Sequence, residues 1–188
     1  TAKNIALIPK NIEKFFSSSD LSVGSRFGNK RGLIIYNKNF NYEKNYLLLS
    51  RYDGDSERSL VELIDLNTGK IIHTWKPDID FILKKIKKNE FIQFERDHNK
   101  KRYQIKFPYL TEEGNLYIKS HYTPLVKLDI CSKYISSIDK VAHHTIESDD
   151  TGIWFPTTDF SSINNPGLDY KVKNEKRLFF DDGITKID

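Results

Sequence analysis

The sequence is poor in sulfur-containing residues. It has one cysteine, Cys131, and no methionine among its 188 residues. A single cysteine excludes a disulfide within the chain, so the fold must rest on a hydrophobic core. The start at Thr1, without a basic segment followed by an apolar one, indicates that a leader has been removed or that the chain is a fragment. The end at Asp188, inside a strand-like run, gives the same indication.

The chain also lacks a long apolar run and a strong excess of one charge. No segment approaches the roughly 20 apolar residues that cross a bilayer, which predicts no membrane span in this chain. The net charge of +4 arises from 30 basic and 26 acidic residues, and it does not indicate a nucleic-acid partner. A length of 188 residues and a hydrophobic fraction of 38% are sufficient for one domain with a core.

Aromatic residues are abundant instead, and together with many Ile, Val and Thr they predict an all-β protein. Aromatics make up 13% of the chain. Residues 1–30 read as a lead-in helix and loop. A second short helix is expected after Pro77, with Ile79, Ile82 and Ile86 on one face. The remainder, 31–188, contains strand-like runs at 32–36, 46–52, 59–66, 70–75, 105–110, 116–122, 125–130, 133–138, 145–148, 153–155 and 184–187.

Similar strands recur along the chain and indicate a repeat. Segments 59–75, 124–139 and 183–188 each contain a strand that ends in an apolar residue followed by aspartate. Repeated units of about four strands are typical of β-propellers. The sequence therefore predicts a partial β-propeller of about three blades, each a four-stranded antiparallel sheet, with short helices at the N-terminus and between blades. A β-sandwich is the alternative. Open blades leave sheet edges uncovered, so we expect the chain to associate.

The strongest chemical signal lies at 143–156, which reads HHTIESDDTGIWFP. This pattern predicts a hairpin that has His143 and His144 at the mouth of its first strand. A neutral imidazole can act as nucleophile, acid, base or metal ligand near pH 7. In a propeller, this position opens into the funnel at one end of the channel. Strand alternation places the two imidazoles on opposite faces, so we expect one of them to face the site and no shared metal.

Most of residues 31–188 resembles the bacterial arylsulfotransferase-like β-propellers. The resemblance rests on VELIDLNTGKIIHTW at 61–75, PLVKLDICSK at 124–133, and above all the histidine-pair hairpin followed by FFDDGITKID at 179–188. It implies an exported or periplasmic six-bladed propeller that uses no cofactor. It implies transfer of a sulfuryl group from a phenolic sulfate ester to a phenol. The implied mechanism is ping-pong and passes through a sulfohistidine.

The resemblance also implies catalytic and substrate-binding residues. His143 or His144 would form the sulfohistidine, and further histidines and an arginine would stabilise the transferred group. Candidates for that second role are His121, Arg51 and Arg177. A packing role for His121 and a surface salt bridge for Arg51 are equally compatible with the sequence. The rival function is a non-catalytic propeller that binds a ligand or protein partner through its funnel.

Overall fold

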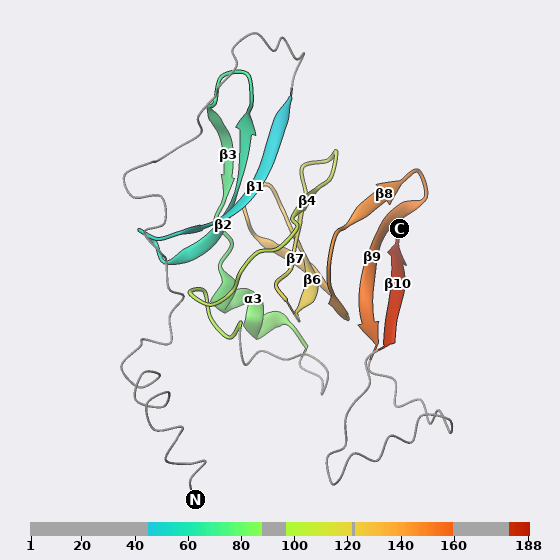
Figure 1. Cartoon of the computed structure of the whole chain (residues 1–188). Coiled ribbons are helices and arrows are strands. Elements are labelled where there is room, and N and C mark those ends of the chain that lie inside the picture. Colours follow the sequence, from blue (N-terminus) through green and yellow to red (C-terminus); the bar gives the residue numbers. More distant parts are fainter. Residues whose placement is uncertain (1–44, 88–96, 122, 160–180) are drawn as a thin grey trace, which may run out of the picture. The chain divides into compact units, whose positions relative to one another are not determined.

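The computed structural model describes residues 45–87, 97–121, 123–159 and 181–188, which form mostly strands and one short helix (Figure 1). No helix in these ranges is long and apolar enough to cross a membrane. The elements are β1 (Tyr46–Asp53), β2 (Arg58–Asp65), β3 (Ile71–Trp75), α3 (Ile79–Lys85), β4 (Tyr109–Leu110), β5 (Leu116–Ile118), β6 (Pro124–Leu128), β7 (Tyr134–Ala142), β8 (Glu147–Asp149), β9 (Gly152–Asp159) and β10 (Asp181–Ile187).

Strands β1, β2 and β3 form a three-stranded antiparallel sheet, here named sheet A. The predicted strands at 46–52, 59–66 and 70–75 are confirmed to within a residue at most ends. The turn between β2 and β3 is held by Asp65, whose carboxylate accepts hydrogen bonds from the amide of Asn67 and the hydroxyl of Thr68. These bonds lower the pKa of Asp65. Gly69 follows with φ of 68°, a conformation that glycine adopts without strain.

The remaining seven strands form a second antiparallel sheet, sheet B, in the order β10-β9-β7-β6-β5-β4, with β8 paired to β9. Strands β4 to β7 form an up-and-down meander of four strands. We expected the strands after residue 142 to begin a separate blade. They join the same sheet instead, because the last residues of the long strand β7 pair with β9 at Val141↔Thr158 and Ala142↔Thr157.

One hydrophobic core extends from sheet A through the helix to sheet B. It contains Val61 and Trp75 from sheet A, and Ile79 and Ile82 from α3, together with the buried strand residues Leu116, Ile118, Val126 and Leu128. The predicted apolar face of the helix is therefore confirmed. Asp78 caps the helix, since its carboxylate accepts a hydrogen bond of 3.1 Å from the Phe81 amide.

Three local expectations were wrong. The predicted strand at 105–110 is reduced to its last two residues, since Phe107 has φ of 47° and cannot continue an extended strand. The sequence predicts an exposed hairpin tip at 97–100, but Asp97 is only 1% exposed. Pro156 does not end its strand, because β9 continues to Asp159 with Pro156 opposite Ile184. The expected elements at 1–30 and 32–36, and most of the expected hairpin at 89–101, lie outside the described residues.

Lys119 is a buried cation next to strand β5. It is 1% exposed, and its Nζ lies 5.1 Å from the centroid of the Phe107 ring. Burial, reinforced by the nearby charge of Lys106, lowers the pKa of Lys119 to about 8. A lysine of ordinary pKa in the unfolded chain binds more protons than this one between about pH 8 and pH 10. The free energy of unfolding therefore rises with pH in this window.

A Lys119→Met variant is expected to be more stable than the wild type at pH 7, by on the order of 1 kcal/mol, because no buried charge remains. The difference should shrink toward pH 10, where the wild-type amine is neutral. Urea unfolding at the two pH values measures both free energies. Lys140→Met, at an exposed position of β7, serves as the control and should show no such pH dependence. An equal stability difference at both pH values would contradict this account.

Candidate functional site

The histidine pair precedes a tight hairpin, as the sequence predicted. Strands β8 and β9 pair from Glu147↔Trp154 to Asp149↔Gly152. The carboxylate of Asp149 holds the turn, accepting hydrogen bonds from the Thr151 hydroxyl at 2.6 Å and the Thr151 amide at 2.8 Å. The hydroxyl bond is the main reason that the pKa of Asp149 falls to about 2. Gly152 has φ of 146°, a conformation that is essentially restricted to glycine.

The two imidazoles lie against each other. Their ring centroids are 4.7 Å apart, with an interplanar angle of 75°. The expectation that strand alternation separates them was wrong. His144 has φ of 55°, so the backbone leaves the extended conformation at this residue and alternation no longer applies. Both rings are therefore in contact and can be considered together as one candidate site.

Asp182 of β10 lies beside His143. The amide of His143 donates a hydrogen bond of 3.0 Å to the carbonyl of Pro156 in β9, and β10 pairs along the same strand. These contacts bring Nε2 of His143 to 3.2 Å from Oδ1 of Asp182. The side chain of His143 is 16% exposed and that of Asp182 is 76% exposed. The carboxylate lies at ion-pair distance, but outside hydrogen-bond alignment, and Nε2 has no other partner among the described residues.

Sequence reasoning did not assign Asp182 to the site. A signal for it was present, since the Asp-Asp-Gly-Ile segment at 181–184 is part of the motif that carries the family resemblance. His143 and Asp182 are 39 positions apart in the sequence, so sequence spacing alone does not predict their contact. Only the antiparallel pairing of β9 with β10 shows that the start of β10 returns to the histidine pair.

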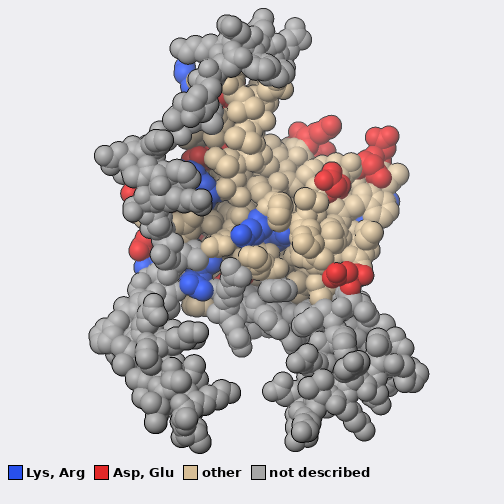
Figure 2. Space-filling model, in the orientation of Figure 1, with Lys and Arg blue, Asp and Glu red and all other residues tan. Residues whose placement is uncertain are grey.

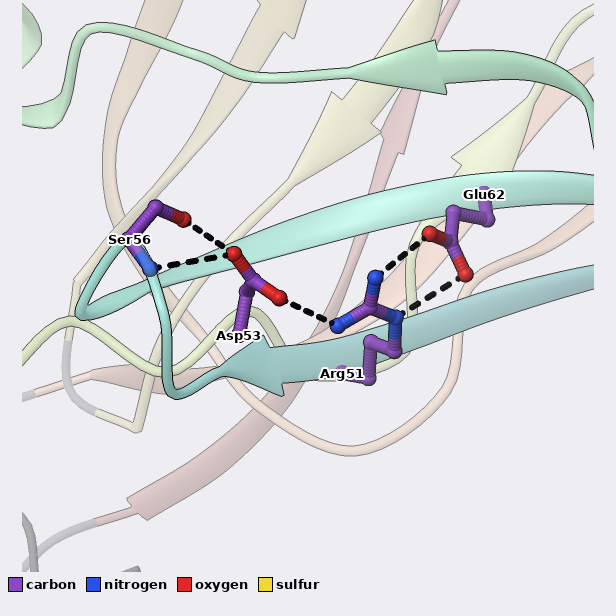
Figure 3. Close-up of polar contacts among 4 residues, drawn as sticks. All are labelled: Arg51, Asp53, Ser56 and Glu62. Atoms are coloured by element: carbon purple, nitrogen blue, oxygen red, sulfur yellow. Dashed lines mark hydrogen bonds and ion pairs between the residues drawn. The ribbon is translucent and has the colours of Figure 1, made fainter. Parts of the chain in front are cut away.

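Arg51, a candidate for substrate binding, is held in a salt bridge within sheet A (Figure 3). Its Nε and Nη2 donate to the two carboxylate oxygens of Glu62 at 2.9 and 2.7 Å, and Nη1 donates to Asp53 at 2.9 Å. The hydrogen bonds to Glu62 are the main cause of the raised pKa of Arg51. Asp53 also accepts hydrogen bonds from the hydroxyl and amide of Ser56, and its pKa falls to about 2. The salt-bridged role is the one that the structure shows.

An Arg51→Met variant is expected to lose about 2 kcal/mol of stability, because Glu62 is only 4% exposed and would be left as a buried charge without its partner. Since Arg51 itself is partly exposed, the loss should stay below that of a fully buried pair. The Arg51→Met/Glu62→Leu double variant should recover much of it. Chemical denaturation measures all three free energies. A single variant that is no less stable than the double variant would refute the buried-charge explanation.

The other sequence candidates are placed separately. His121 is half-buried in the turn between β5 and β6. Arg177 lies outside the described residues. The segment Asp53-Gly54-Asp55, whose acidic residues are spaced as in part of a calcium loop, belongs to the hairpin connection between β1 and β2. Within the part of the chain that the structure describes, no three or more His, Cys, Asp or Glu side chains are grouped to hold a metal ion.

No family model, curated protein or solved structure matches this chain. Its function must therefore be inferred from the histidine pair and the surroundings of the pair. Figure 2 shows acidic side chains over the part of this face where β8 and β9 lie. Exposed Glu147, Asp149 and Asp150 belong to that hairpin. These carboxylates would repel an anionic substrate.

Proposed function

We propose that this chain is an arylsulfotransferase-like protein that transfers a sulfuryl group from a phenolic sulfate ester to a phenol. The observation that carries the proposal is the placement of Asp182 beside Nε2 of His143. A carboxylate that orients one imidazole nitrogen prepares the other for nucleophilic or base catalysis. The second histidine, His144, whose ring meets that of His143 edge to face, adds a nitrogen donor next to the reacting ring.

The proposed reaction uses the tautomer of His143 that carries its proton on Nε2. The lone pair is then on Nδ1, and the carboxylate of Asp182 lies at ion-pair distance from Nε2. Nδ1 attacks sulfur, the bond between sulfur and the phenolic oxygen breaks, and the phenolate leaves. The ring becomes a sulfohistidine cation, which the carboxylate of Asp182 stabilises. An acceptor phenol gives its proton to solvent and attacks sulfur, and the nitrogen–sulfur bond breaks to restore neutral His143. The phenolate released in the first step takes up a proton from solvent.

His144 is proposed to bind the sulfuryl oxygens. It is exposed, and its ring meets that of His143 edge to face, so both can contact one small group. When protonated it donates a charge-assisted hydrogen bond to an anionic oxygen. The acidic side chains of the hairpin oppose the approach of an aryl sulfate. Added salt should screen this repulsion and lower the KM for the ester.

The fold and location belong to the same proposal. We propose a partial β-propeller in which the meander β4 to β7 forms one blade and sheet A contributes to another, in a protein that is exported to the periplasm. The up-and-down order of these strands supports the blade assignment, because propeller blades are four-stranded meanders. The alternative of a ligand-binding, non-catalytic propeller uses the same strands and the same histidines.

The direct test is turnover of a chromogenic aryl sulfate with a phenol acceptor. The proposal predicts phenol release that requires the acceptor, with parallel double-reciprocal plots, since a covalent intermediate separates the two half-reactions. Equilibrium binding of the same ester is measured in parallel. Binding without turnover would support the non-catalytic propeller. Absence of both would refute a site for aryl sulfates at the histidine pair.

A further inference from the structure

Strand β10 forms one edge of sheet B. It pairs with β9 on one side, and among the described residues no strand pairs with its other side. The carbonyl oxygen of Ile187 points at Gly152 on the β9 side, because a Cβ built on Gly152 would lie 2.4 Å from that oxygen. Peptide groups alternate sides along an antiparallel strand. The N–H and C=O groups of Asp182, Ile184 and Lys186 therefore point toward the free edge.

The same three residues share one face of the strand and are exposed, whereas Gly183, Thr185 and Ile187 are half-buried. Ile184 is the most exposed large apolar residue in the described part of the chain, at 77%. The acidic residue Asp182 lies two positions before Ile184, and the basic residue Lys186 lies two positions after it. Lys186 already contacts Asp188 at 3.3 Å, but Asp188 is 94% exposed, so this pair is weak and can exchange.

We propose that β10 pairs antiparallel with β10 of a second copy of this chain, centred on Ile184. In this register, Ile184 faces its own counterpart. Asp182 of each copy faces Lys186 of the other, so the two ends of the contact carry opposite charges. The outward N–H and C=O groups of the three residues then form the hydrogen-bonded pairs of one continuous ladder. The interface is isologous, as a two-fold axis through Ile184 requires.

Neighbouring registers lack this match. A shift of the centre to Asp182 places two aspartates opposite each other. A centre at Lys186 places two lysines opposite each other and Ile184 opposite Asp188. Like charges directly opposite across two strands are destabilising, so the pattern selects the Ile184 register. Charged residues often protect an edge strand from pairing, but here the order of charges is complementary to itself.

Charge reversal tests this dimer. Sedimentation equilibrium of the full chain should show a monomer–dimer equilibrium for the wild type. Asp182→Lys and Lys186→Asp should each weaken dimerisation about tenfold or more, because each places like charges opposite one another. The Asp182→Lys/Lys186→Asp double variant should recover dimerisation. Ile184→Lys should give a monomer, since two lysines would face each other at the centre.

The control is Asp55→Lys, which makes the same charge change at an exposed position in the turn between β1 and β2 of sheet A and should remain dimeric. Circular dichroism establishes that each variant retains its strand content. If the double variant recovers dimerisation, misfolding does not explain the weaker dimerisation of the two single variants. A monomeric wild type, a dimer insensitive to both reversals, or no recovery in the double variant would overturn the proposal.

Discussion

A Gly152→Ala variant is expected to lose about 2–4 kcal/mol of unfolding free energy. Two costs add at this position. The backbone of Gly152 has φ of 146°, which residues with a Cβ rarely adopt. A Cβ there would also lie 2.4 Å from the carbonyl oxygen of Ile187 and 3.2 Å from its carbon, and these backbone atoms cannot rotate away. The end of β10 must therefore move away from the hairpin.

Urea unfolding of Gly152→Ala measures this loss. Gly183→Ala is the matched control on β10, because a Cβ on Gly183 would meet the Thr157 hydroxyl at 3.5 Å, an ordinary contact. The control should change the stability little. Since β10 carries Asp182, the Gly152 variant should also lose transferase activity beyond its loss of folded protein. A Gly152 variant as stable as Gly183→Ala would contradict the close approach of Ile187.

A His143→Ala variant is expected to lower kcat for sulfuryl transfer about a thousandfold or more, because the reacting nitrogen is removed. Asp182→Asn should give a smaller loss, since the reacting nitrogen remains but the neutral amide does not offset the positive charge of the intermediate. His144→Ala removes a hydrogen-bond donor to the sulfuryl oxygens, and we expect it to lower kcat about a hundredfold. Steady-state kinetics at saturating ester measure all three.

His98→Ala provides the histidine control for these kinetics, because His98 is exposed and lies in the turn region after Asp97 rather than on the hairpin. Its kcat should match that of the wild type. Thermal unfolding of each variant separates loss of chemistry from loss of fold. If His143→Ala retains wild-type kcat while folded, the catalytic assignment of this histidine fails.

Local signals in the sequence were sufficient for much of the fold. The Asn-Thr-Gly turn after Asp65 and the Asp-Asp-Thr-Gly turn at 149–152 each place a hairpin correctly, because short polar side chains bond to their own turn amides. The helix after Asp78 follows from its cap and from three isoleucines at helical spacing. Such features depend on neighbours in the sequence, so they can be predicted from it.

What the sequence could not predict depends on backbone conformation at single residues or on distant pairing. The sequence of a histidine pair does not predict that His144 has a positive φ. This backbone conformation brings the two rings together. The approach of Asp182 to His143 requires the pairing of β9 with β10 across a long intervening segment. Arg51 lies within β1, but only the register of β1 with β2 shows that Glu62 lies within reach.

The most direct measurement is trapping of the sulfohistidine. The full chain is incubated with an aryl sulfate and no acceptor, and the modified peptide is identified by mass spectrometry. The account predicts one added sulfuryl group on His143, which persists in His144→Ala and is lost in His143→Ala. Addition of a phenol acceptor should remove it. A chain that turns over the ester without this adduct, or carries it on another residue, would contradict the central claim.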